Sequence, residues 1–163
     1  MGRDGSLDWL CFPRFDSPAC FAALLGTVDH GRWLLAPVGS TRRVNRSYRG
    51  DTRDTLVLET TFTTDTGEAT VIDCMPIRSG QPDVVRVVVG RRGVVRMRTH
   101  FAPRFDYGSL TPLVRPDDGG VVAVGGPDTL HLRTPAPLRI EQWAATCRVP
   151  VSYTHLTLPT NRE

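Results

Sequence analysis

The sequence predicts a mainly β fold, an antiparallel β-sandwich with one short helix near the N-terminus. Seven or more short apolar segments, rich in β-branched residues, are separated by turns of Gly, Pro and Asp. One segment, residues 94–101, alternates strictly. It predicts Val95, Met97, Thr99 and Phe101 on a dry face and Arg96, Arg98 and His100 on a wet face. The 163 residues suffice for one domain with its own core.

The N-terminal segment contains the predicted helix. Residues 7–12 predict a strand and residues 13–16 a turn. Residues 19–25 are good helix formers and predict a helix of about two turns. The residues around them suit the cap, the first helical position and the end of a helix: Ser17, Pro18 and Gly26.

The rest of the chain predicts strands and hairpins. Residues 56–63 and 68–74 flank a turn and predict a hairpin, as do residues 121–124 and 129–133. Three more segments complete the pattern: a short strand at 32–36, an apolar run at 84–89 of the kind buried on both faces, and residues 138–149, which fit a strand or a helix equally.

Composition excludes several classes of protein. All 20 basic residues are Arg, and they are spread along the chain, which argues against a nucleic-acid surface despite the net charge of +3. No apolar run approaches the roughly 20 residues of a membrane helix, and no secretory signal precedes the β segments, so a cytoplasmic protein is expected. The four cysteines form no C-x-x-C pair, and buried thiols in a reducing compartment are predicted.

Several sequence blocks carry a family resemblance. Residues 2–26 begin Gly-Arg-Asp-Gly-Ser-Leu-Asp-Trp-Leu-Cys-Phe-Pro-Arg-Phe-Asp-Ser-Pro, and three later blocks follow in order: Tyr48-Arg49-Gly50-Asp51 with Leu56 to Thr60, Asp73-Cys74-Met75-Pro76, and Arg104-Phe105-Asp106-Tyr107-Gly108. Over residues 2 to 140 the chain resembles the N-terminal domain of bacterial glycoside hydrolase family 15, the glucoamylase and trehalase group. The resemblance implies a supersandwich that precedes an (α/α)₆ catalytic barrel.

The two ends of the chain depart from the family pattern. Family members have a further stretch, an opening strand, before the Gly-Arg-Asp-Gly-Ser element, so residues 1–149 are expected to form an incomplete N-terminal β-sandwich domain. Val151 to Thr160 corresponds to the translation of a DNA adapter used in transposase-based library preparation. Residues 150–163 are therefore predicted to be a non-native tail without function.

The resemblance implies a parent enzyme that hydrolyses α-glucosidic bonds with inversion, using two glutamates of the barrel. This chain is expected to be inactive alone, to use no cofactor or metal, and to have as partners the barrel and, in the parent, an α-glucoside; no nucleic acid or membrane partner is expected. No catalytic residue is assigned, because Glu59 and Glu68 fall within a hairpin. The histidines His30, His100 and His131 are too scattered for a metal site or a dyad.

The best candidates for a functional role are Trp9, Arg14 and Asp16. The indole could stack on a sugar, the two charged groups could bind hydroxyls, and the resemblance places this loop at the rim of the active site. The favoured alternative is structural, with Trp9 and Phe15 in the core, Asp16 capping the helix and Arg14 paired locally. The Arg104 to Gly108 block is interpreted as structural, with an ion pair and a turn.

A second function remains open, a stand-alone sandwich that binds carbohydrate or another protein. It requires a surface platform of aromatic side chains, and three Trp and three Tyr make that platform hard to build. The fragment hypothesis instead predicts exposed apolar surface and self-association.

Overall fold

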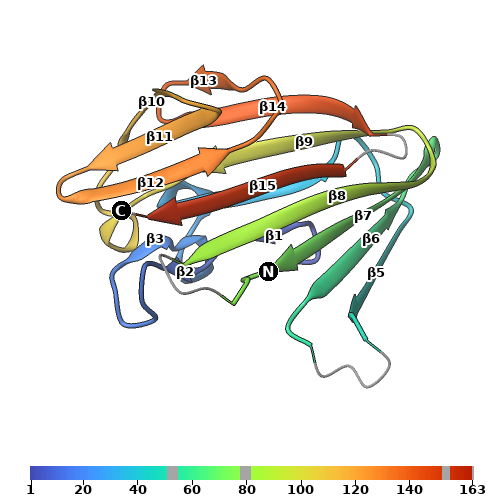
Figure 1. Ribbon diagram of the computed structural model, residues 1–163, viewed down its shortest axis with the longest axis horizontal. Helices are drawn as coiled ribbons and strands as arrows, with labels where there is room; N and C mark the ends of the chain where they lie inside the picture. The colour runs from blue at the N-terminus through green and yellow to red at the C-terminus, as the bar shows by residue number, and fades with distance from the viewer. Residues whose placement is uncertain (51–54, 78–81, 152–154, 163) are drawn as a thin grey trace.

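The computed structural model describes residues 1–50, 55–77, 82–151 and 155–162, and it confirms the mainly β prediction. Two antiparallel sheets and a small hairpin make up the fold (Figure 1). The smaller sheet has the order β1 (Ser6–Leu7), β4 (Arg32–Pro37), β9 (Val95–Ala102), β14 (Ala144–Val151), β13 (Arg139–Glu141). The larger sheet has the order β10 (Leu113–Asp117), β11 (Gly120–Gly125), β12 (Asp128–Arg133), β15 (His155–Arg162), β8 (Asp83–Gly93), β7 (Gly67–Cys74), β6 (Leu58–Thr63), β5 (Arg43–Tyr48).

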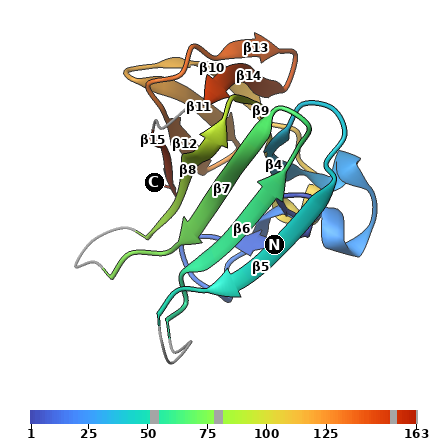
Figure 2. The same ribbon diagram turned by 90° about the vertical axis from the view of Figure 1, so that its right-hand side faces the viewer.

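Short elements lie between the strands of the two sheets. Strands β2 (Leu10–Cys11) and β3 (Ala19–Phe21) form a separate two-stranded hairpin. Three single 3₁₀ turns follow in the chain: η1 (Ala23–Leu25), η2 (Val28–His30) and η3 (Asp106–Gly108). Figure 2 shows the large sheet from β8 to β5 in front, with β4 and β9 behind it.

One hydrophobic cluster joins the two sheets into a sandwich. Trp33 and Phe101 of the small sheet meet edge to face at 5.8 Å between ring centroids, and Phe21 of the small hairpin packs on Phe101 in the same way. Phe62 and Leu130 enter the same cluster from the large sheet. Aromatic pairs in this geometry stabilise a core beyond the area that they bury.

Both predicted hairpins are confirmed. Strands β6 and β7 pair from Leu58 opposite Asp73 to Thr63 opposite Glu68, and β11 pairs with β12 around the turn at Gly126. The alternation of residues 95–101 is also confirmed, since Val95, Met97, Thr99 and Phe101 are buried while Arg96 and Arg98 face solvent. The turn-forming residues and the alternation of apolar and polar side chains along the strands were sufficient to predict these elements.

The predicted helix over residues 19–25 is wrong in its first half. Ala19 to Phe21 form β3, and only Ala23 to Leu25 make a 3₁₀ turn. Cys20 and Phe21 are fully buried in the strand, whereas Leu24 and Leu25 of the turn are exposed. A two-turn helix has little intrinsic stability, so the burial gained by pairing β3 with β2 outweighs helix propensity.

The predicted strand over residues 7–12 is divided. β1 ends at Leu7 in the small sheet, and β2 begins at Leu10 in the separate hairpin. Asp8 lies between these two strands. Its carbonyl accepts a hydrogen bond from the Leu24 amide (3.0 Å), which fixes the link between β1 and β2 against η1.

The apolar run at 84–89 is not buried on both faces. Val84, Arg86 and Val88 are buried, but Val85, Val87 and Val89 on the other face are only half-buried. A run of β-branched residues therefore did not indicate burial on both faces of the strand. Arg86 lies in the same strand and is fully buried, which the sequence analysis did not predict.

The end of the chain is β structure. Residues 138–149, which the sequence left open, form β13 and most of β14. Residues 155–162 form β15, which pairs with β8 on one side and with β12 on the other. Residues 155–162, which belong to the segment predicted to be a non-native tail, therefore lie between β12 and β8 in the large sheet.

Candidate functional site

The loop that carries Trp9 and the block from Arg104 to Gly108 lie against each other. The Trp9 ring is 6.0 Å from the Tyr107 ring, with 37° between their planes. The Arg104 amide donates to the Cys20 carbonyl (2.9 Å), which fixes the start of the second block against β3. Trp9 is half-buried, so it is neither a core residue nor a free surface platform.

The Tyr107 block is a tight turn, as predicted. Asp106 and Tyr107 adopt left-handed backbone conformations with φ of 48° and 58°. Gly108 has a φ of 99°, and a Cβ there would lie 2.9 Å from the His30 ring, so this position requires glycine. Arg104 donates to the carbonyls of Pro103 (2.7 Å) and Trp143 (3.4 Å), where an ion pair had been predicted.

Arg14 and Asp16 form a bidentate pair on the exposed loop between β2 and β3. Arg14 Nε donates to Asp16 Oδ1 and Arg14 Nη2 to Asp16 Oδ2, both at 2.8 Å. The pairing lowers the pKa of Asp16 and raises that of Arg14. The local pairing of Arg14 is thus confirmed, and the pair presents a charged, planar hydrogen-bonding surface to solvent.

Two phenylalanines of this loop differ in their burial. Phe12 is fully buried, whereas Phe15 is 90% exposed, so the prediction of Phe15 in the core is wrong. The loop is closed by the Ser17 amide, which donates to the Arg14 carbonyl (3.1 Å), and this turn holds Phe15 outward. Asp16 caps no helix, because β3 follows the loop.

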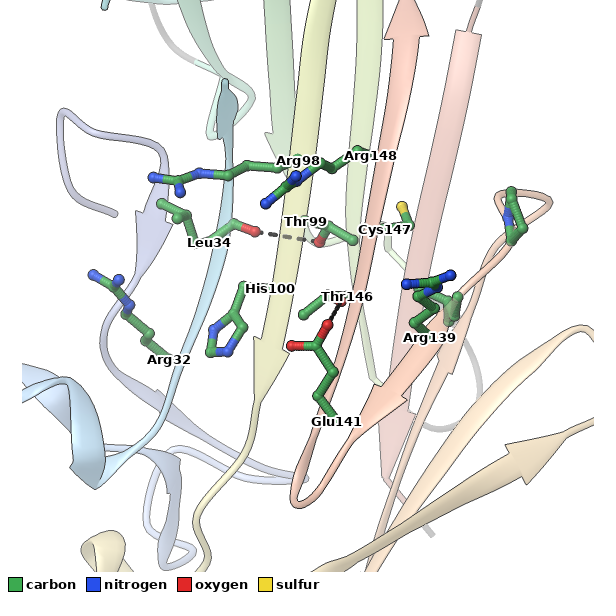
Figure 3. A pocket seen from close by; sticks show the side chains of 12 residues that line it. Arg32, Leu34, Arg98, Thr99, His100, Arg139, Glu141, Thr146, Cys147 and Arg148 are labelled. Atoms are coloured by element: carbon green, nitrogen blue, oxygen red, sulfur yellow. Dashed lines mark hydrogen bonds between the residues drawn. The ribbon is translucent and has the colours of Figure 1, made fainter. Parts of the chain in front are cut away.

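A second feature, absent from the sequence prediction, is a hollow of about 780 Å³ on the outward face of the small sheet (Figure 3). We call it the arginine hollow and define it by Arg32 of β4, Arg98 and His100 of β9, Arg139 and Glu141 of β13, and Arg148 of β14. Each sits on an outward position of its strand. The alternation of Arg98 and His100 was visible in the sequence, but their neighbours come from strands far away in the chain.

His100 lies between Arg32 and Glu141 in the arginine hollow (Figure 3). Burial lowers the pKa of His100 below its ordinary 6.5, nearby Arg32, Arg104 and Arg98 lower it further, and Glu141 opposes them. The ring is therefore neutral at neutral pH. Glu141 accepts a hydrogen bond from the Thr146 hydroxyl (3.1 Å).

The other candidate groups have structural partners. Glu59 pairs with Arg49 (2.6 Å), and Glu68 accepts from the Thr63 hydroxyl (3.1 Å). Cys74 and Cys147 are free thiols; Cys20 and Cys147 are buried, and Cys11 and Cys74 are half-buried. Within the described ranges, no three His, Cys, Asp or Glu side chains gather in a way that could hold a metal ion, and no helix is long and apolar enough to cross a membrane.

A profile described as "Trehalase-like, N-terminal" matches residues 1–146, which is most of the chain and includes both motif blocks. The chain belongs to the trehalase-like N-terminal domain family. The resemblance found in the sequence blocks is thereby confirmed at the level of this domain.

Curated relatives of this family member are named trehalases. The chain is 36% identical over 118 residues to Trehalase 1 of Sulfolobus acidocaldarius, covering 72% of this chain and 19% of the relative. It is 33% identical over 111 residues to the trehalase of Mycobacterium tuberculosis (68% and 14%) and 41% identical over 71 residues to that of Mycolicibacterium smegmatis (44% and 10%). The matched segment thus spans less than a fifth of each of these relatives. No solved structure matches the chain significantly.

Proposed function

We propose that this chain is the accessory N-terminal domain of an inverting glycoside hydrolase of family 15 that cleaves trehalose, and that an (α/α)₆ catalytic domain supplies the reacting carboxylates. The observation that carries the proposal is the family match over residues 1–146, with relatives named trehalase. Maltodextrins are the second substrate class, because the sequence blocks resemble glucoamylases as well.

The carboxylates of this chain support an accessory role. An inverting glycosidase requires an acid and a base about 6.5–9.5 Å apart on either side of the scissile bond. Glu59, Glu68 and Glu141 each have a partner in the sheets to which they belong. We therefore assign the chain no catalytic residue and expect it to be inactive alone.

We assign Trp9, Arg14 and Asp16 to the rim of the parent's active site. The partly exposed indole offers an apolar face to a sugar ring, and the Arg14–Asp16 pair offers charge-assisted hydrogen bonds to hydroxyls. Nearby, Phe15, Leu24 and Leu25 expose large apolar side chains on the loop and η1. Exposed apolar side chains of this kind are typical of an interface, and we propose that they face the catalytic domain.

We propose that the parent enzyme is cytoplasmic, because the free thiols of Cys74 and Cys147 fit a reducing compartment. Fractionation of the source cells with an antibody against residues 1–149 tests this placement, and trehalase activity in the extracellular fraction would contradict it.

The decisive test uses the parent enzyme, expressed from its complete reading frame, with trehalose and maltodextrin as substrates. Proton NMR of the first products should show α- and β-glucose in equal amounts from trehalose, because inversion converts one of the two α-glucosyl units. Release of α-glucose alone indicates retention and contradicts the proposed mechanism. The isolated chain should release none.

The rim is tested in the same parent by W9L, R14Q and D16N, with the exposed R115Q on the large sheet as control. We expect KM for trehalose to rise several-fold in the rim variants, with a smaller change in kcat, and no change in R115Q. Wild-type kinetics in all three would remove the rim assignment without affecting the assignment of the parent. Calorimetric binding of trehalose to the isolated chain would favour a stand-alone binding module.

A further inference from the structure

The residues that line the arginine hollow carry more positive than negative charge. Arg32, Arg98, Arg139 and Arg148 line it, and within the described part of the chain Glu141 is the one carboxylate among its lining residues. Four guanidinium groups and one carboxylate leave a formal charge of +3. A cleft lined by one sign of charge focuses the field on a ligand of the opposite sign.

Strand register forces two of these arginines together. Arg98 of β9 lies directly opposite Arg148 of β14, in the run that also pairs Thr146 with His100. Directly opposed residues of an antiparallel pair have Cβ atoms about 4.5–5.5 Å apart, and like charges there are destabilising. Figure 3 shows both side chains extending the same way, toward β4. The register and this shared direction therefore place both guanidinium groups on the same face of the small sheet.

Arg32 adds an unsatisfied donor to the same hollow. Its Nε is buried and has no hydrogen-bond partner within the described part of the chain. A buried donor without an acceptor costs free energy, and such groups are rare in folded proteins. An acceptor atom from outside this chain would satisfy it.

The floor of the hollow strengthens binding of a charged ligand. Leu34 lies on the outward face opposite His100 but is only 5% exposed, and Thr99 beneath is buried. Charge interactions over such a floor are less screened than on an open surface. Neutral His100 can donate one ring N–H without adding to the repulsion among the arginines.

We propose that the arginine hollow binds a multivalent oxyanion, whose oxygens bridge Arg98 and Arg148 and accept from Arg32. Guanidinium groups bind phosphate and carboxylate through paired N–H donors. An anion between Arg98 and Arg148 is attracted by both guanidinium groups and offsets the repulsion between them. The oxyanion comes either from the phosphate group of a small molecule or from neighbouring carboxylates of a polypeptide. The site lies on the sheet face and is independent of the proposed active-site rim.

Titration of the ¹⁵N-labelled chain by NMR tests the site, with three probes at matched ionic strength: inorganic phosphate, a hexaglutamate peptide and sodium chloride. We expect saturable shifts of the amides of β9 and β14 with phosphate or with hexaglutamate, and only small linear shifts with chloride. Whichever probe saturates identifies the source of the oxyanion. The pKa of His100 should rise on saturation, because the bound charge offsets the arginines around it.

Two variants make the test specific. R148Q removes one bridging arginine, and R115Q removes an exposed arginine of β10 in the other sheet. We expect R148Q to weaken binding of the saturating probe by roughly tenfold or more, as the loss of a charge-assisted hydrogen bond does, and R115Q to leave it unchanged. Without ligand, R148Q should raise the midpoint of thermal unfolding, because it relieves the repulsion with Arg98.

Three results would overturn the proposal. Amide shifts that rise linearly with both phosphate and hexaglutamate, as with chloride, would show only general screening of the protein's charges by salt. If R148Q and R115Q weakened binding of the probe equally, the probe would be attracted by the net charge of the chain and not by the arginine hollow. A lower unfolding midpoint in unliganded R148Q would show that Arg148 already has its stabilising partner within the chain.

Discussion

Arg86 and Asp73 lie opposite each other on β8 and β7 and form an ion pair inside the sandwich, with Arg86 Nε 2.8 Å from Asp73 Oδ1. Both side chains are buried. Two further donors of Arg86 reach across to the small-sheet side: Nη1 donates to the Trp33 carbonyl (2.9 Å) and Nη2 donates to the Gly5 carbonyl (2.7 Å). The guanidinium also lies 5.0 Å over the Trp33 ring. One side chain thus joins both sheets and the N-terminal turn.

Replacement of Arg86 by Met should therefore destabilise the chain severely. The variant leaves Asp73 buried without its cation and two carbonyls without donors, and breaking a buried pair in this way costs about 3–5 kcal/mol. Urea unfolding measures the difference, with R115Q as an exposed control that should stay within about 0.5 kcal/mol of wild type. The double variant R86M/D73L should recover part of the loss. Wild-type stability of R86M would show that the network is dispensable.

Phe12 and Phe15 provide a matched pair within one loop. F12A should cost about 3–5 kcal/mol, because it opens a cavity beneath the hairpin of β2 and β3. F15A should change the free energy of unfolding by no more than about 0.5 kcal/mol and should reduce self-association of the isolated chain. Equilibrium unfolding and light scattering measure the two effects. A large loss of stability in F15A would place Phe15 in the core after all.

His100 predicts a specific acid sensitivity. Burial and the surrounding arginines Arg32, Arg104 and Arg98 lower its pKa in the folded state, against the opposing effect of Glu141, so the unfolded chain takes up the proton first as the pH falls. The stability contributed by neutral His100 is complete above pH 6.5 and is lost as the pH falls from 6.5 through the lowered pKa. Urea unfolding between about pH 5 and 8 should show a smaller loss of stability on acidification in H100Q than in wild type. Parallel pH profiles would contradict this.

Strand β15 predicts the effect of shortening the chain. Removing residues 152–163 leaves the facing edges of β8 and β12 without the backbone partners that β15 gives them. Unpaired edges favour pairing between chains, so the chain ending at Val151 should form oligomers that grow with concentration, more than the full chain does. Size-exclusion chromatography with light scattering measures this. A monomer with a sharp unfolding transition would show that the tail is not needed, and would also weaken the fragment hypothesis.

Local signals predicted much of the fold. The hairpins at 58–74 and 120–133 and the alternation of β9 follow from turn residues and a period of two, which operate within a few residues. The helix over 19–25 was predicted wrongly because local propensity favoured a helix, while the burial of Phe21 against Phe101 depends on a strand 80 residues away.

The candidate sites were less predictable for the same reason. The motif residues Trp9, Arg14 and Asp16 could be named from the sequence, but the packing of Trp9 on Tyr107 joins segments 98 residues apart. Phe15 was assigned to the core because large apolar residues are usually inside, but its side chain is 90% exposed. The arginine hollow depends on the register of β9 with β14, which no local pattern specifies.

The central claim, that this domain is the N-terminal part of a larger trehalose-cleaving enzyme, is tested most directly by sequencing the genomic DNA downstream of the codon for Val149. We expect a reading frame that departs from the adapter-like codons and continues into a long helical region with two glutamates placed for inversion. A stop codon directly after Val149, or a genomic sequence that encodes residues 150–163 as they stand and then ends, would contradict it.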